Sequence, residues 1–324
     1  MNTDNYLIID AHFDLLTYVT ERRKEGKKQV IMNRFYDDFK KGKVNIIVSS
    51  LFISEKYIPE MALRNALDQI ASLHYEIEES EGKIMLCRNM KDIQYAIDNQ
   101  KLGILLSFEG LDPIGNDLYL LKVFYELGVR FAGLVWSRRN YVADGAFFSE
   151  VETGTEGGLS SFGVKIVKEA ERLGMLIDVS HLNDSGFWDV IKFTTKPIIA
   201  SHSNVRKLFN SKRNLTDEQI KAIANNSGVI GINANGMFVT DNNSENNING
   251  LIKHIDYIAN LVGVEHVGFG FDLCDMFRDE QVDSLNTHKE IPVLIEKLKE
   301  HGYTETEIKK ITGENFLRVY KSIL

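Results

Sequence analysis

The sequence predicts a single α/β domain over residues 1–324, folded as a (β/α)₈ or TIM barrel. Eight short apolar runs rich in β-branched residues recur along the chain, and stretches with helical spacing separate them. Acid and imidazole side chains also stand at the ends of several runs, where a barrel would bring them together. Length alone would suggest two domains, but α/β barrels often run to about this size as one.

The eight runs are continuously apolar rather than alternating, as expected of strands buried on both faces of a parallel sheet. In chain order they are YLIIDAH (6–12), VNIIVSSLFIS (44–54), LGILLSFEG (102–110), VRFAGLVWS (129–137), GMLIDVSH (174–181), PIIASHS (197–203), GVIGINAN (228–235) and HVGFGFD (266–272). An open, doubly wound sheet is the competing fold. Its Gly-x-Gly-x-x-Gly turn is missing after the first run, which favours the barrel slightly.

Amphipathic helices are predicted between these runs. Residues 61–79 place apolar side chains at helical spacing, and residues 160–173 do the same. Thr216, followed by Glu218 and Gln219, is a typical start for a helix through Ala224. Residues 247–262 and 288–300 complete the helices predicted from the pattern.

Composition excludes several classes of function. The net charge of −8 argues against a nucleic-acid partner, because binding phosphates needs a basic surface. The two cysteines, Cys87 and Cys274, give neither a disulfide framework nor a cysteine zinc motif. The pattern shows no leader, spanning segment or lipid-anchor signal, so we expect a cytoplasmic protein without a membrane partner.

Six acid or imidazole side chains lie at the carboxyl ends of the predicted strands, which converge on one face of a barrel. They are His12 and Asp14, then Glu109, His181, His202 and Asp272. Each one alone could be a hydrogen-bonded structural residue, but together they indicate a metal site. Imidazole and carboxylate ligands suit zinc or a similar ion, and the set is too large for one tetrahedral catalytic ion. Two ions that share one carboxylate fit it better.

The remaining histidines are predicted to be structural or surface residues, because they lie on helices or before strands. They are His74, His254, His266, His288 and His301. Asp10, two residues before His12, is interpreted as a buried partner or a further ligand.

The pattern resembles the membrane-dipeptidase (renal dipeptidase-like) family of zinc peptidases, in its bacterial type. The motifs that carry the resemblance are IIDAHFDLL, SFEG, IDVSH, SHSNVRKLFNSKRNLTDEQI, VGFGFD and TGENFLRV. They extend over nearly the whole chain, and the segment from His202 to Asp217 is the most specific. The resemblance implies a barrel of the metal-dependent hydrolase type, with two Zn²⁺ ions, that hydrolyses small dipeptides, L-L and L-D forms among them. Relatives are usually dimers, so a homodimer is possible.

Roles for individual residues follow from the resemblance. His12, Asp14 and a bridging Glu109 would hold one ion, and Glu109, His181 and His202 the other. A bridging hydroxide would attack the peptide carbonyl. Asp272 would move the proton as general acid and base, and Glu109 would be the second catalytic residue. Arg213 would bind the terminal carboxylate of the substrate, since a guanidinium matches a carboxylate in a bidentate pair.

The residues predicted to contact the substrate depart from the animal pattern. Trp136 stands where animal members have a histidine, with Asn140 nearby, and Phe238 stands where they have a tyrosine. We therefore predict that Trp136 and Asn140 contact the substrate and that the metal ligands are intact.

Two other functions compete with this interpretation. Deaminases and cyclic amidases on related barrels commonly open with two histidines on the first strand and bridge their ions with a modified lysine after the fourth. Here the first pair is His12 and Asp14, and no lysine ends the fourth run. A metal-binding relative without catalytic activity would be favoured by loss of a ligand or of Asp272, and none is lost.

Overall fold

The computed structural model describes residues 6–148, 151–276 and 283–324 and confirms the closed parallel barrel. The eight strands of the barrel are β1 (Ile9–Phe13), β2 (Ile46–Phe52), β4 (Leu102–Glu109), β5 (Val129–Gly133), β6 (Leu176–Asp178), β7 (Ile198–Ala200), β8 (Val229–Ile232) and β9 (Val267–Phe269). The sheet closes because β2 pairs with β1 on one edge and with β4 on the other. Each of the eight predicted runs coincides with one of these strands, and only β1 extends past its run, by Phe13.

A further strand, β3 (Ile84–Leu86), lies outside the closed barrel. It pairs with the first half of β4, at Leu102–Ile104, while β5 pairs with the second half from Leu106 onward. The sequence pattern did not predict this strand, because three residues are too few to show a periodicity.

Most strands are shorter than the predicted runs, because the last residues of each run leave the sheet and turn over the end of the barrel. β6, for example, ends at Asp178, whereas the predicted run continues to His181. His181 has a φ of 69° and Asp272 a φ of 58°, in the left-handed region that side chains seldom adopt. The residues predicted at strand ends therefore lie mostly in the first turn of the following loops.

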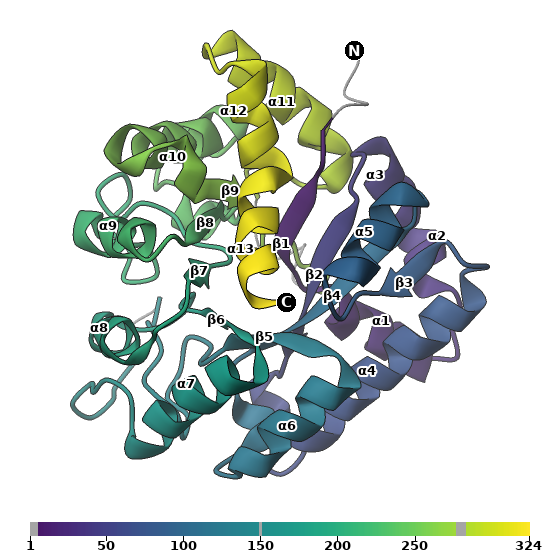
Figure 1. The fold of residues 1–324 in the computed structure, drawn as a ribbon, viewed down its shortest axis with the longest axis vertical. Helices are drawn as coiled ribbons and strands as arrows, with labels where there is room; N and C mark the ends of the chain where they lie inside the picture. Colours follow the sequence, from purple (N-terminus) through teal and green to yellow (C-terminus); the bar gives the residue numbers. More distant parts are fainter. Residues whose placement is uncertain (1–5, 149–150, 277–282) are drawn as a thin grey trace.

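Helices surround the barrel on its outer face, except for the last one, which lies across one end of the barrel (Figure 1). They are α1 (Leu15–Lys24), α2 (Val30–Arg34), α3 (Tyr36–Lys41), α4 (Ala62–Glu79), α5 (Met90–Asp98), α6 (Leu118–Leu127), α7 (Ser161–Leu173), α8 (Asp184–Phe193), α9 (Asp217–Asn225), α10 (Ile248–Val262), α11 (Ile291–Glu300), α12 (Glu305–Lys309) and α13 (Asn315–Ile323). The five predicted helices correspond to α4, α7, α9, α10 and α11. Thr216 caps α9 and forms a capping box with Gln219, as its spacing suggested.

The apolar core has two parts. One lies between the strands and the surrounding helices, and the other fills the inside of the barrel. Phe316, Val319 and Tyr320 of α13 pack against the inner strand residues, among them Phe131 of β5. Figure 1 shows α13 lying across one end of the barrel, the end at which the strands begin. Among the helices of the described residues, none is both long and apolar enough to cross a membrane.

Candidate metal centre

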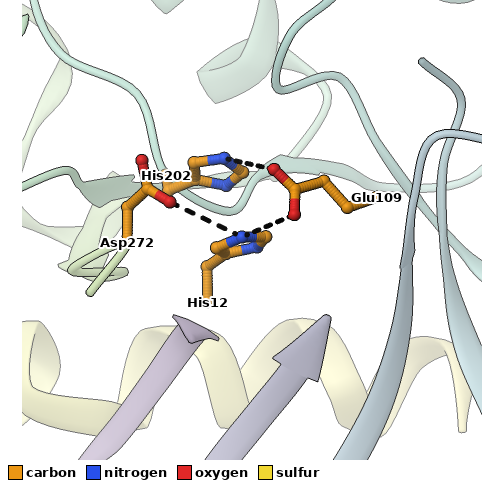
Figure 2. Close-up of side chains that lie close together, drawn as sticks. All are labelled: His12, Glu109, His202 and Asp272. Atoms are coloured by element: carbon orange, nitrogen blue, oxygen red, sulfur yellow. Dashed lines mark ion pairs between the residues drawn. The ribbon is translucent and has the colours of Figure 1, made fainter. Parts of the chain in front are cut away.

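The six predicted acid and imidazole residues meet at the carboxyl end of the barrel. His12 lies in β1 and Asp14 directly follows it, Glu109 is the last residue of β4, and the other three follow β6, β7 and β9. Five of the side chains are buried, and that of Asp272 is 12% exposed. Figure 2 shows four of them, with the carboxylates of Glu109 and Asp272 on opposite sides of the stacked rings of His12 and His202.

The Glu109 carboxylate faces imidazoles on two sides. Its Oε2 lies 3.4 Å from Nε2 of His12. Its Oε1 lies 3.1 Å from Nε2 of His181 and 3.9 Å from Nε2 of His202. This is the arrangement expected of a carboxylate shared between two ions.

Asp14 and Asp272 lie on the His12 side of the centre. The Oδ1 atom of each is 3.7 Å from Nε2 of His12. His12 and Asp14, two residues apart at the end of β1, therefore face the same point, as predicted. Ligand atoms of His12, Glu109, His202 and Asp272 all lie within 4.8 Å of one another.

Several buried polar atoms at this centre lack a partner that would satisfy them. Both ring nitrogens of His12 and Oε2 of Glu109 have no hydrogen-bond partner within the described chain. The Nε2 atoms of His181 and His202 face each other at 2.9 Å. A buried polar group without a partner costs about 1–3 kcal/mol, so several at one point indicate a missing component. Divalent cations fit, because these are the atoms that would ligate them.

The charges of the centre also favour cations. Burial raises the pKa of Glu109 to about 8, and the negative charge of Asp14 adds to the effect. Burial likewise raises the pKa of Asp272 to about 6. For His181 and His202, burial lowers the pKa well below its usual value, so the imidazoles are neutral and able to ligate.

Neighbouring polar side chains orient the ligands, and the sequence pattern did not identify them. Ser50 donates a hydrogen bond to Oδ1 of Asp14, and Nδ2 of Asn233 donates to Oδ2 of Asp272 at 2.8 Å. Ser137 lies 2.8 Å from Nδ1 of His181. Ser50 lies within β2, and Asn233 and Ser137 follow β8 and β5, so their position near strand ends was the one available signal.

Arg213 lies beside the centre, in the loop between β7 and α9. Its side chain is buried and donates from Nη2 to the backbone carbonyl of His202 at 2.9 Å and from Nη1 to Oγ of Ser203 at 3.1 Å. Its Nε has no hydrogen-bond partner within the described residues, and its guanidinium lies 5.7 Å from the ring centre of Phe238. The structure thus brings Arg213 next to the ligands.

A cavity of about 270 Å³ opens above the ligands. Its polar lining comes from Asp14, Glu109, His181, Asn235 and Asp272, and its apolar lining from Phe52, Trp136, Phe148, Met237, Phe238 and Cys274. The aromatic rings form a chain of contacts, with centre distances of 5.4 Å from Phe52 to Trp136, 5.6 Å from Trp136 to Phe148 and 5.6 Å from Phe148 to Phe238. Trp136 therefore lies where a ligand of the centre would contact it.

Asn140 is not among the residues that line this cavity, and its contact with the substrate stays a prediction. Its Nδ2 donates to the carbonyl of Leu134, and its Oδ1 accepts from the backbone N–H groups of Val142 and Ala143. The amide is used to shape the turn after β5. Asn140 is close to Trp136 in the sequence, but in the fold its amide faces the backbone of its own turn.

Two of the histidines predicted to be structural are buried and hydrogen-bonded. Nδ1 of His254 accepts from the backbone N–H of Val205 at 3.1 Å, and its Nε2 lies 3.0 Å from the carbonyl of Val239. Nε2 of His288 lies 2.7 Å from Oδ2 of Asp10. Asp10 is thus a partner of His288, and it lies in β1 two residues before His12.

Comparisons with known proteins agree with this geometry. The sequence model of the family described as "Membrane dipeptidase (Peptidase family M19)" matches residues 3–323. The chain is similar to an uncharacterized protein in the pqqA 5′ region of Klebsiella pneumoniae, with 33% identity over 79% of this chain and 94% of the relative. It is 28% identical to human dipeptidase 3, over 98% of this chain and 65% of the human protein.

Solved structures resemble the fold over nearly its full length. A metallo peptidase from Rhodobacter sphaeroides, liganded with a phosphinate mimic of the dipeptide L-Ala-D-Ala, has a TM-score of 0.88 and 24% identity, covering 98% of this chain and 99% of that one. The metallo peptidase dipeptidase AC, of family M19, has a TM-score of 0.86 and 25% identity, covering 98% of each chain.

Proposed function

The chain belongs to the membrane dipeptidase family of metallopeptidases, and from this premise we propose that it is a two-zinc dipeptidase acting on free L-L and L-D dipeptides. The observation that carries the proposal is the Glu109 carboxylate, which faces His12 through one oxygen and His181 through the other. The phosphinate mimic of L-Ala-D-Ala bound by the R. sphaeroides structure supports including L-D substrates.

The ligands divide between two ions. His12 and Asp14 would hold one, His181 and His202 the other, and Glu109 would contribute one oxygen to each. When bound, two such cations activate the attacking water and neutralise charge on the oxygen of the tetrahedral intermediate.

Asp272 would hold and move the proton. Its carboxylate lines the cavity, and Asn233 holds Oδ2, which leaves Oδ1 on the side of the centre. A carboxylate at this place in the cavity can take a proton from water and release it to the leaving amine. The amide of Asn233 positions it for both transfers.

Arg213 would select free dipeptides over longer peptides. Its buried guanidinium lies next to His202, and its Nε has a hydrogen left to donate in the described part of the chain. A carboxylate one residue beyond the cleaved bond would pair with it, and a longer peptide would have no carboxylate at that distance. The aromatic side chains around the cavity, including Trp136 and Phe238, favour apolar substrate side chains.

A metal analysis combined with a substrate panel tests the proposal. We expect two zinc ions per chain after zinc loading, hydrolysis of apolar L-L and L-D dipeptides, and much weaker hydrolysis of tripeptides. Removing zinc with a chelator should abolish turnover, and adding zinc back should restore it. At most one ion per chain after loading would refute the shared role of Glu109. A fully loaded protein that cleaves none of the dipeptides would refute the activity.

A further inference from the structure

Two buried aspartates, Asp10 and Asp178, make the same set of backbone contacts beneath the metal centre. Oδ1 of Asp10 accepts from the backbone N–H of His12 at 3.2 Å and of Phe271 at 3.0 Å. Oδ1 of Asp178 accepts from the backbone N–H of Ser180 at 3.0 Å and of Ser201 at 2.9 Å. Each carboxylate therefore joins two neighbouring strand ends, β1 to β9 and β6 to β7, from which ligands project.

The second oxygen of each carboxylate has a different partner. Oδ2 of Asp10 meets His288, which is not a predicted ligand. Oδ2 of Asp178 accepts from the hydroxyl of Ser201, and Oγ of Ser201 lies 2.6 Å from Nδ1 of the ligand His202. A chain of contacts thus leads from Asp178 to an imidazole of the centre, whereas Asp10 touches its neighbouring ligand His12 only through the backbone.

The hydrogen bonds fix where the proton of His202 lies. A carboxylate can only accept, so the single hydrogen of the Ser201 hydroxyl points to Asp178. Oγ of Ser201 then accepts from the ring, which places the hydrogen of His202 on Nδ1. The Nε2 atom, which faces His181 and Glu109, keeps its lone pair.

We propose that Asp178, acting through Ser201, is a positioning residue that holds His202 in the Nδ1–H tautomer required to bind a metal ion through Nε2. The inference rests on the proposed function, because it assumes that His202 is a ligand. Carboxylates that orient a ligating histidine typically change metal affinity 10- to 100-fold when they are replaced.

Asp178→Asn tests the direction of these hydrogen bonds. The amide oxygen can keep the two backbone contacts, which leaves the NH₂ group facing Ser201. The Ser201 hydroxyl then loses Asp178 as the acceptor of its hydrogen, which can turn to Nδ1 of His202 or to Oγ of Ser180, 3.3 Å away. Donation to His202 moves the ring hydrogen to Nε2 and blocks the metal. We expect zinc affinity to fall 10- to 100-fold, measured against a competing chelator. Imidazole ¹⁵N shifts of the zinc-free variant should show the changed tautomer at one histidine.

Asp10→Asn is the matched control. It makes the same exchange in the same kind of backbone contact, but its second oxygen faces His288, so no ligand tautomer should change. We expect less than about a 3-fold change in zinc affinity and wild-type ¹⁵N shifts at His202. The second oxygen of Asp10 contacts His288, which is not a ligand, so the replacement should leave the ligands unchanged. If both variants lose affinity equally with unchanged tautomers, the aspartates merely join strands and the proposal is wrong.

Ser201→Ala provides a second variant if Asp178→Asn does not fold. It keeps both backbone contacts of Asp178 and removes the hydroxyl that links Asp178 to His202, together with its 3.3 Å contact to Oγ of Ser180. Zinc affinity should fall while the melting temperature of the zinc-free protein stays near wild type. Unchanged zinc affinity in Ser201→Ala would overturn the proposal. These outcomes differ from failure of the proposed function, in which the wild-type protein itself would bind fewer than two ions or cleave no dipeptide.

Discussion

At its amino-terminal end the barrel is closed by α13, whose Phe316 and Tyr320 are fully buried among strand residues. At the carboxyl end the same strands carry acids and imidazoles, several of them without satisfied partners. One end is apolar, and the other is polar and carries the side chains that would hold cations. The difference indicates that the first end supplies stability and the second supplies function, at some cost in stability.

Among the variants that compare the two ends of the barrel, we expect Asp272→Asn to have the largest effect. The amide keeps the shape but cannot move a proton, so kcat should fall about 10²- to 10⁴-fold while two zinc ions remain bound. Steady-state kinetics with metal analysis of the same sample provide the measurement. A fully loaded variant with near-normal kcat would remove Asp272 from the mechanism, and loss of zinc would make it a ligand instead.

Arg213→Met should show a similar loss that depends on the substrate. Removing one partner of a buried charged pair costs on the order of 2–5 kcal/mol, which is roughly 30- to 4,000-fold in kcat/KM at 1.36 kcal/mol per decade. Arg213→Lys should keep only part of the activity on free dipeptides, because the lysine ammonium lacks the planar fork of a guanidinium. Dipeptide amides are the control: the wild type should lose activity on them by a similar factor, and the Met variant should be nearly indifferent. Wild-type cleavage of amides at full rate would exclude this role.

At the closed end, Phe316→Ala should change stability and leave the chemistry intact. Emptying a fully buried aromatic site costs about 3–5 kcal/mol of unfolding free energy. Denaturant unfolding measures that loss, and kcat of the folded fraction should stay at the wild-type value. Tyr320→Phe is the matched control, because its hydroxyl has no hydrogen-bond partner in the described structure, and its stability should change by less than about 1 kcal/mol. A large loss of kcat in Phe316→Ala would show that the two ends are coupled.

The smallest effect concerns His254, a buried histidine near the functional end that is not a ligand. Burial lowers its pKa from 6.5 to about 4, so folding favours the neutral ring. Its contribution is complete above pH 6.5 and disappears as the pH falls toward 4, a loss of about 3 kcal/mol. The difference in unfolding free energy between zinc-free wild type and His254→Gln should shrink over this range. A constant difference from pH 7 to pH 4 would contradict it.

The sequence predicted the fold well because the barrel strands are continuous apolar runs, a signal that needs no knowledge of tertiary contacts. The metal ligands stay a prediction, and they were selected for a related reason: residues such as His12 and Glu109 lie at the ends of those runs, and parallel strand ends converge. The pattern predicted less where the signal is tertiary. β3 has only three residues, and Asn140 turns its amide to the backbone.

Residues that support the ligands were also beyond the sequence pattern. Ser201 contacts Asp178, 23 positions earlier in the chain, and a serine beside a histidine has no distinctive meaning until the strands are paired. Asn233 was likewise visible only once β8 and β9 were placed next to each other.

The pairing of β1 with β9 has a consequence for how the protein is made. Asp10 accepts a hydrogen bond from Phe271, 261 positions later, so His12 and Asp272 meet only after nearly the whole chain has left the ribosome. Contacts this distant in sequence close late in folding. A partly synthesised chain therefore holds His12 and Asp14 without Asp272, and the six residues of the candidate centre come together only when the barrel closes.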